Sequence, residues 1–254
     1  MLLLYLPINT WFFLLLEFSF LLFQQTDAKE IVRKADEKYR GSKSSYAEIT
    51  ITIERPSWSR QMSIKTWTMG EKYAMVLTTA PVKDKGTAFL KRDLEIWNWV
   101  PAVERTIKLP PSMMSQSWMG TDFTNDDLIK QSSIVNDYDH TIISEVVIDD
   151  LLCYKIQLIP KPNAAVVWGK IITCIDKKEY MQMRVEFYDE YGELINTMKS
   201  YDIQELGGKI LPTRMEMIPS DKKGNKTIMK YHVLKYDIPI DESFFSTSNM
   251  RNLR

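Results

Sequence analysis

The sequence has few of the side chains on which most metal sites and nucleophilic enzymes depend. Its 254 residues include only two histidines, His140 and His232, and two cysteines, Cys153 and Cys174. Histidine and cysteine are the usual ligands of zinc and the usual groups of nucleophilic catalysis. The G-x-S-x-G, P-loop, H-E-x-x-H and C-x-x-C motifs are also absent. The sequence therefore predicts a protein that is not an enzyme and that holds no metal and no cofactor.

A charge excess is missing as well. Lys plus Arg total 33 and Asp plus Glu total 33, so no basic surplus exists to bind a phosphate backbone. Nucleic acid is therefore excluded as a main partner. With 44% apolar residues, 26% charged residues, 9 Gly and 11 Pro, the composition also excludes disorder and collagen, and is typical of a globular chain with a well-buried core.

The N-terminus combines an apolar run with almost no charge. Trp11–Phe23 has the length of the apolar region of a secretory signal, and Glu17 is the only charge before residue 24. Small residues precede a possible cleavage site after Ala28, but no basic residue comes before Lys29. We expect residues 1–28 to form a signal peptide, and retention of the segment as a membrane anchor stays open as the alternative.

The residues after the leader predict one helix followed by many strands. Lys29–Arg40 carries apolar residues at helical spacing and ends before Gly41. Period-two alternation and regularly spaced turn residues then predict strands in two series, 46–54, 61–69, 72–79, 85–91, 94–100 and 104–109 followed by 141–148, 150–159, 166–175, 180–188, 194–203, 209–218 and 227–236. Roughly a dozen consecutive short strands are typical of an antiparallel meander.

Between the two series, residues 110–133 lose the strand pattern and predict a loop with short helical turns. Thr124 and Asp127 fit a capping box for a short helix over Asn125–Gln131. A brief helical turn is also expected over Pro239–Phe245. No linker or internal repeat separates the strands, so we expect a single domain over residues 29–254.

The two cysteines flank a predicted hairpin loop at Pro160–Ala164. A symmetric antiparallel register would place Cys153 opposite Cys174, at a separation that a disulfide can bridge. The alternative is a pair of buried thiols facing a core. The sequence alone leaves both open.

One helix and many antiparallel strands fit a strongly curved or half-closed barrel whose open side is covered by helical pieces. The helix has to bury its apolar stripe, and the concave face of the sheet is the available place. The 14 methionines, several of them on the late strands, suit either an ordinary core or an adaptable apolar binding surface.

The stretch Gly86–Leu128 is the most specific part of the chain. The residues that support a resemblance there are Leu94–Pro101, Arg105, the serine and methionine loop, and Met119–Thr124. The leader, the opening Ala35-Asp36 helix, the segment Cys153–Pro160 and the Tyr188–Gly192 hairpin support it as well. Over nearly all of its length after the leader, the chain resembles the outer-membrane lipoprotein-sorting proteins of the LolA/LolB superfamily.

This resemblance implies a mainly β fold, an unclosed antiparallel β-barrel of about eleven strands with a helical lid over an apolar cavity. It also implies a periplasmic carrier without catalysis, which ferries acylated lipoproteins or lipids towards the outer membrane and works with an inner-membrane donor complex and an outer-membrane acceptor. A non-catalytic lipid-sensing or scaffold module on the same fold is the alternative. We expect the wall or lid of the cavity to include Ile51, Trp67, Trp97, Trp99, Met113, Met114, Trp118, Met119 and Phe123.

Overall fold

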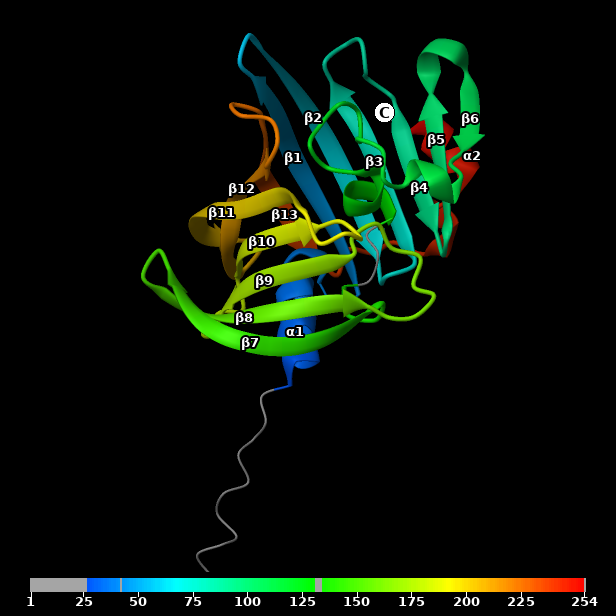
Figure 1. The fold of residues 1–254 in the computed structure, drawn as a ribbon. Helices are drawn as coiled ribbons and strands as arrows, with labels where there is room; N and C mark the ends of the chain where they lie inside the picture. Colours follow the sequence, from blue (N-terminus) through cyan, green and yellow to red (C-terminus); the bar gives the residue numbers. More distant parts are fainter. Residues whose placement is uncertain (1–26, 42, 131–133, 254) are drawn as a thin grey trace, which may run out of the picture.

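The computed structural model describes residues 27–41, 43–130 and 134–253 (Figure 1). The predicted signal peptide therefore lies almost wholly outside the described residues. No helix within these three ranges has the length and apolar character needed to span a membrane.

The strands form one antiparallel sheet of thirteen strands, in the order β6-β5-β4-β3-β2-β1-β13-β12-β11-β10-β9-β8-β7. The strands are β1 (Ser44–Arg55), β2 (Trp58–Met69), β3 (Tyr73–Ala80), β4 (Ala88–Arg92), β5 (Glu95–Val100), β6 (Arg105–Lys108), β7 (Tyr138–Ile148), β8 (Leu151–Pro160), β9 (Lys170–Asp176), β10 (Gln182–Tyr188), β11 (Leu194–Leu206), β12 (Lys209–Pro219) and β13 (Lys226–Tyr236). Each overlaps one of the predicted segments. The count of about eleven is too low, because the described residues form thirteen strands.

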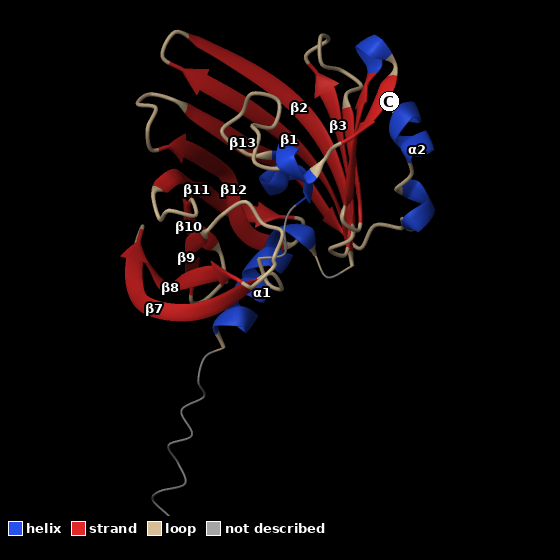
Figure 2. Cartoon of the chain, turned by 45° about the vertical axis from the view of Figure 1, so that its right-hand side comes forward, coloured by secondary structure: helices blue, strands red, loops and turns tan. Residues whose placement is uncertain are grey.

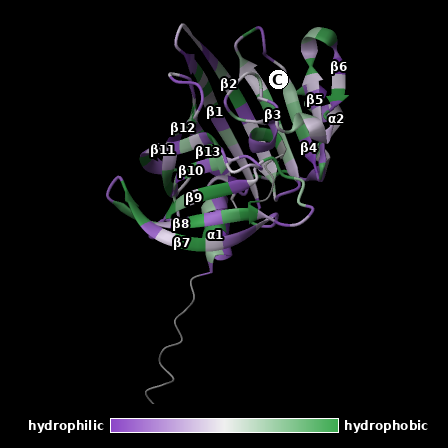
Figure 3. Cartoon of the chain, in the orientation of Figure 1, coloured by the Kyte–Doolittle hydropathy of each residue, from purple (hydrophilic) through white to green (hydrophobic). Residues whose placement is uncertain are grey.

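The sheet curls without closing. Pairing of β1 with β13 joins the two series of strands, and β6 and β7 form the two edges (Figures 1 and 2). Side chains of β1 alternate between the two faces of the sheet. Ile49, Ile51 and Ile53 are buried on the inner, concave face, while the threonines between them are only partly buried. Figure 3 shows hydrophobic residues concentrated on the strands and hydrophilic residues in most of the turns.

The helix α1 (Ala28–Arg40) confirms the predicted first helix. The side chain of Asp27 caps it by accepting a hydrogen bond from the backbone N–H of Lys29 at 2.9 Å, and Gly41 ends it at a φ of 72°. Its apolar stripe, which includes Ile31 and Val32, is buried, and the helix packs against β1, β7 and β9. The concave face of the sheet thus receives the helix as expected.

The connecting segment, residues 109–130 and 134–137, links the edge strands β6 and β7. It contains the short helical turns η3 (Pro111–Met113) and η4 (Asp126–Lys130), and η4 packs against β3 and β4. The predicted capping box is present: the N–H of Thr124 donates to Asp127 Oδ2 at 2.8 Å, and the N–H of Asp127 donates to Thr124 Oγ1 at 3.1 Å. The turn that follows is a π-helix.

The C-terminal residues cover the outer face of the sheet. Two short helices follow β13, η5 (Glu242–Phe244) and α2 (Thr247–Asn252). A further short helical turn, η2 (Pro101–Val103), lies in the β5–β6 turn. The turn at η5 confirms the one predicted for Pro239–Phe245, whereas α2 is not predicted. Phe245 and Met250 are fully buried there and form a second hydrophobic cluster with β3 and β4.

The symmetric register predicted for the cysteines is wrong. Cys153 pairs with Asp176, and Cys174 pairs with Lys155, so the two cysteines are diagonal neighbours rather than opposite each other. Both are free and buried, and they pack with Met181 and Met183. The alternative, two buried thiols facing a core, matches the structure.

Candidate ligand cavity

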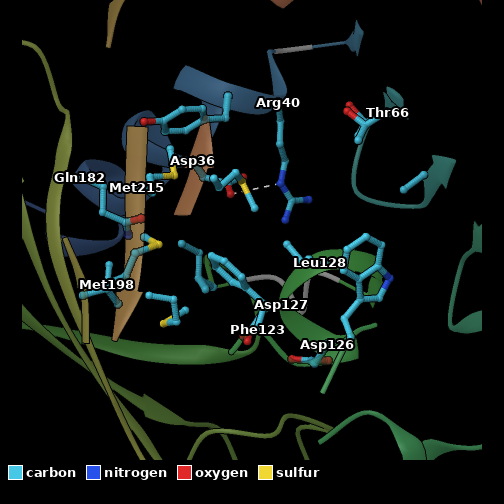
Figure 4. Close-up of a pocket in the computed structure, with 18 of the residues that line it drawn as sticks. Asp36, Arg40, Thr66, Phe123, Asp126, Asp127, Leu128, Gln182, Met198 and Met215 are labelled. Carbon is cyan, nitrogen blue, oxygen red and sulfur yellow. Dashed lines mark ion pairs between the residues drawn. The ribbon is translucent and has the colours of Figure 1, made fainter. Parts of the chain in front are cut away.

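A cavity of about 260 Å³ lies between the concave face of the sheet, α1 and η4 (Figure 4). Residues from both series of strands, from α1 and from the connecting segment line it. They are Ala35, Asp36, Tyr39, Arg40, Ile49, Ile64, Thr66, Trp67, Thr68, Ala74, Met75, Val76, Trp118, Phe123, Asp126, Asp127, Leu128, Ile134, Tyr138, Leu158, Trp168, Ile171, Thr173, Gln182, Val185, Phe187, Met198, Met215, Met217, Met229 and Tyr231.

One wall consists largely of methionine. Met198 on β11, Met215 and Met217 on β12 and Met229 on β13 all line the cavity, and the register places Met198 opposite Met217 and Met215 opposite Met229. Figure 4 shows Met198 and Met215 on the side of the cavity across from Leu128. Because unbranched thioethers repack at little cost, this wall suits apolar ligands of variable shape.

The cavity also has a polar side on α1. Asp36 and Arg40, one helical turn apart, form an ion pair at 3.1 Å with 19% and 15% of their side chains exposed. Burial raises the pKa of Asp36, and the charge of Arg40 opposes that rise. Figure 4 shows this pair at the edge of the cavity.

A second acidic group enters from η4. Burial raises the pKa of Asp127 to about 6, although hydrogen bonds from Thr124 favour its charged form. Asp127 Oδ1 also accepts a hydrogen bond from the indole N–H of Trp168 at 2.9 Å. The cavity is therefore amphipathic: mostly apolar, with ionisable groups on α1 and η4.

The connecting segment is fastened to the sheet near its middle by a buried ion pair. Both terminal guanidinium nitrogens of Arg55 lie 3.0 Å from the carboxylate of Asp122, with 13% and 8% of the two side chains exposed. Thr227 on β13 donates to the same carboxylate at 2.7 Å. The ring of Trp118 packs on Phe89 of β4, with centroids 5.7 Å apart.

Several residues predicted for the wall or lid lie at the cavity or beside it. Trp118 and Phe123 line the cavity, and Met113, Met114 and Met119 pack against the main core from the connecting segment. Ile51 is fully buried in that core and does not line the cavity.

The placement predicted for the tryptophans of β5 is wrong. Trp97 and Trp99 pack in the outer cluster beneath the C-terminal residues. Trp67 lines the cavity as predicted, and its ring also packs on Phe244 of the outer cluster at 5.6 Å. For β5, a shift of one residue in the assumed facing exchanges the two faces of the strand, which explains the misplaced tryptophans.

Sequence reasoning noticed the methionines of the late strands but did not assign them to the cavity. Their spacing of two on β12 was the available signal, since Met215 and Met217 share a face. Asp36 and Arg40 were missed, although their i, i+4 spacing predicts an ion pair on a helix. Within the described ranges, no group of three or more His, Cys, Asp or Glu side chains is placed to hold a metal.

Comparisons with known proteins agree with the fold. A family model described as "Uncharacterized protein" matches residues 70–252. No curated protein matches the sequence. The fold is that of a DUF1329 family protein from Desulfovibrio piger, with a TM-score of 0.78 and 21% identity over 88% of this chain and 97% of that one.

Two further solved structures have the same fold. A domain from Vibrio parahaemolyticus, described as an outer membrane lipoprotein-sorting protein, has a TM-score of 0.77 and 19% identity over 88% of this chain and 98% of that one. A LolA superfamily protein from Nitrosomonas europaea has a TM-score of 0.76 and 22% identity over 87% of this chain and 98% of that one. These three likenesses confirm the fold that the resemblance implies.

Proposed function

The chain belongs to the family whose model matches residues 70–252, and we propose that it is a carrier that binds the acyl chain of a lipoprotein or lipid in its cavity. It carries no catalysis and ferries its cargo through the periplasm towards the outer membrane. Two structural neighbours, one described as a lipoprotein-sorting protein and the other as a LolA superfamily protein, support this proposal.

The observation that carries the proposal is the construction of the cavity. Methionines of β11–β13 form one wall, and the connecting segment covers it with Trp118, Phe123 and Leu128. An acyl chain needs an apolar wall of adaptable shape, and it needs a cover that can exchange with it. Both are built from separate parts of the chain.

Energetics explain why the cover is needed. Burial contributes about 0.8 kcal/mol per CH₂, so a chain of about 16 carbons is worth on the order of 12 kcal/mol, which would trap the cargo. At about 260 Å³ the cavity lies just below the range of about 300–1,000 Å³ that is typical of ligand sites. The cargo must therefore displace side chains of the cover, so that one apolar contact replaces another. The connecting segment acts as the lid.

The rest of the proposal concerns location and partners. Residues 1–28 direct export and are removed, and residues 29–254 form one domain that works in the periplasm. An inner-membrane complex loads the cargo and an outer-membrane acceptor receives it.

The first test is extraction of lipid from protein purified out of its own cell envelope, followed by mass spectrometry. We expect copurified acyl lipid or lipopeptide, and a mature N-terminus at Lys29. The second test is binding of a fluorescent fatty acid. Met198→Trp fills the cavity and should lower the affinity at least tenfold, whereas Ile203→Trp, at a 42% exposed position of the same strand, should leave it unchanged.

Equal affinity of both variants, together with an extract free of acyl lipid, would overturn the carrier. A sensing or scaffold module would instead yield a stable protein partner, and cells would tolerate Met198→Trp without loss of lipoprotein sorting. Trp97→Asp is a further control, since Trp97 lies in the outer cluster and the change should not alter the affinity for the probe.

A further inference from the structure

Several turns of the first series of strands share one end of the sheet. In an antiparallel meander every second turn lies at the same end, which places the β1–β2, β3–β4 and β5–β6 turns together. Figures 1 and 2 differ by a rotation about the vertical axis, and in both views these turns stand at the top of the molecule at a similar level. The β12–β13 turn lies at the same end because β13 runs antiparallel to β1. We call these four turns the rim.

A large apolar side chain is exposed in, or directly beside, each of the first three rim turns. The exposed fractions are 51% for Trp58, 89% for Val82 and 58% for Val103. Most other turns are hydrophilic (Figure 3). At the opposite end of the same strands Leu94 is also exposed, but the neighbouring β2–β3 turn consists of glycine and charged residues. Exposed large apolar side chains therefore occur at all three turns at this end of β1–β6, and at one of the two turns at the other end.

Exposed lysines accompany these apolar tips. Lys83 and Lys85 flank the tip of the β3–β4 turn, and Lys222 and Lys223 lie in the β12–β13 turn. The acid within the β3–β4 turn, Asp84, is paired with Arg60 at 2.7 Å. Exposed acids are fewer than exposed lysines in these turns: Glu104 lies beside Val103, and Asp221 lies beside Lys222. The rim thus combines separated apolar tips with an excess of basic side chains.

From this arrangement we propose that the rim docks on the surface of a lipid bilayer with anionic headgroups. Tryptophan prefers the level of the headgroups, valine adds apolar area just below it, and lysines near the surface attract anionic lipid. Two weak signals of this kind together give reversible attachment. A protein partner is disfavoured, because the cores of protein interfaces are contiguous and depleted of lysine.

The rim also lies next to a point where the connecting segment is fastened. Asp122 is held by Arg55, the last residue of β1 before the β1–β2 turn. A bilayer bound at the rim would therefore face the fastening that has to be released. This places cargo transfer at the docked face, and in that respect the inference extends the proposed function while standing on separate observations.

Label depth gives the first test. The exported protein is prepared as Val82→Cys and, as a control, Leu94→Cys, and each is labelled with bimane. The native thiols are buried, and burial raises the pKa of Cys153 to about 11, so the introduced thiol reacts first. With vesicles of phosphatidylglycerol and phosphatidylcholine containing brominated acyl chains, we expect quenching of the label at position 82 of at least threefold over that at position 94. Equal quenching at the two positions, or stronger quenching at 94, overturns the proposal.

Affinity for the same vesicles gives the second test. Val82→Asp combined with Val103→Asp should lower binding more than tenfold, while Leu94→Asp should not change it. Lys83→Gln with Lys85→Gln should also lower binding more than tenfold, because one lysine near an anionic surface contributes a factor of about five. The matched control is Lys43→Gln with Lys72→Gln, two exposed lysines at the opposite end. Rim and control variants of equal affinity refute docking.

The two proposals fail in different ways. Rim variants should bind the fluorescent fatty acid as the unaltered protein does, since none of the rim tips lines the cavity. Loss of vesicle binding with intact probe binding supports the rim. If the unaltered protein fails to bind the fluorescent fatty acid but still docks on vesicles, the carrier proposal is overturned and the docking proposal stands.

Discussion

The ion pair between Arg55 and Asp122 offers the most direct test of how the cover is held. Asp122→Ala removes two charge-assisted hydrogen bonds of 3.0 Å and the 2.7 Å hydrogen bond from Thr227. Arg55 then remains buried without a counter-charge. Loss of one partner of a buried pair costs about 3–5 kcal/mol.

We expect a value near the lower limit, about 3 kcal/mol. Arg55 keeps carbonyl acceptors at Glu54, 2.8 Å away, and at Lys226, 3.1 Å away, so its charge is not left wholly unsolvated. Urea unfolding followed by tryptophan fluorescence measures the change in the free energy of unfolding.

The double variant Arg55→Met with Asp122→Leu supplies the control, because it removes both charges and leaves none buried. It should be more stable than Asp122→Ala alone. A loss below about 1 kcal/mol for Asp122→Ala, or additive effects of the two sites, would show that this pair does not fasten the segment.

Three further predictions concern other parts of the molecule. In the folded protein the pKa of Asp127 is raised from 3.8 to about 6, so ionisation of this group destabilises the fold as the pH rises through that window. Asp127→Asn should reduce the loss of unfolding free energy between pH 4 and pH 7 by roughly 2–3 kcal/mol. An unchanged pH profile would contradict the burial of the carboxyl. Phe245→Ala should lower the free energy of unfolding in urea by about 3–5 kcal/mol and leave the affinity for the fluorescent fatty acid unaltered, because Phe245 packs on Tyr73 in the outer cluster. Weakened probe binding by the folded variant would argue against separate clusters. Ellman's reagent should detect two thiols in denaturant without reductant and few in the folded state; finding none in denaturant would indicate a disulfide between Cys153 and Cys174.

The strands and α1 could be predicted because their signals are local. Alternation in β1, the stripe of α1 and the stop at Gly41 each depend on neighbouring residues, and the order of an antiparallel meander follows from short turns. The capping box of Thr124 and Asp127 was likewise readable from its spacing.

What could not be predicted depends on long-range contacts. Which face of β5 is covered depends on α2, whose short sequence carries little helical signal, so Trp97 and Trp99 were assigned to the wrong side. The β8–β9 register depends on an asymmetric loop, in which Trp168 is held by Asp127 from η4 and by the ring of Phe187 at 5.1 Å. No pattern along β8 and β9 alone encodes such a contact.

The connecting segment is fastened at two separate places, and a test of the coupling between them shows whether it opens as one body. Asp122 joins Arg55 near the rim, and Asp127 accepts the indole N–H of Trp168 in the lining of the cavity. Trp168→Phe removes that hydrogen bond and keeps an aromatic ring against Phe187. Each of the two single variants, Asp122→Asn and Trp168→Phe, should speed exchange of the fluorescent fatty acid in stopped-flow experiments.

If the segment moves as one body, either fastening alone still holds it, and the double variant Asp122→Asn with Trp168→Phe should speed exchange by more than the product of the two single effects. If the two fastenings open independently, the increases in exchange rate of the two single variants multiply in the double variant. Unchanged exchange in both single variants and in the double variant would show that the cargo does not enter by movement of this segment. Because the two fastenings share no residue, a departure from the product reports movement of the segment itself.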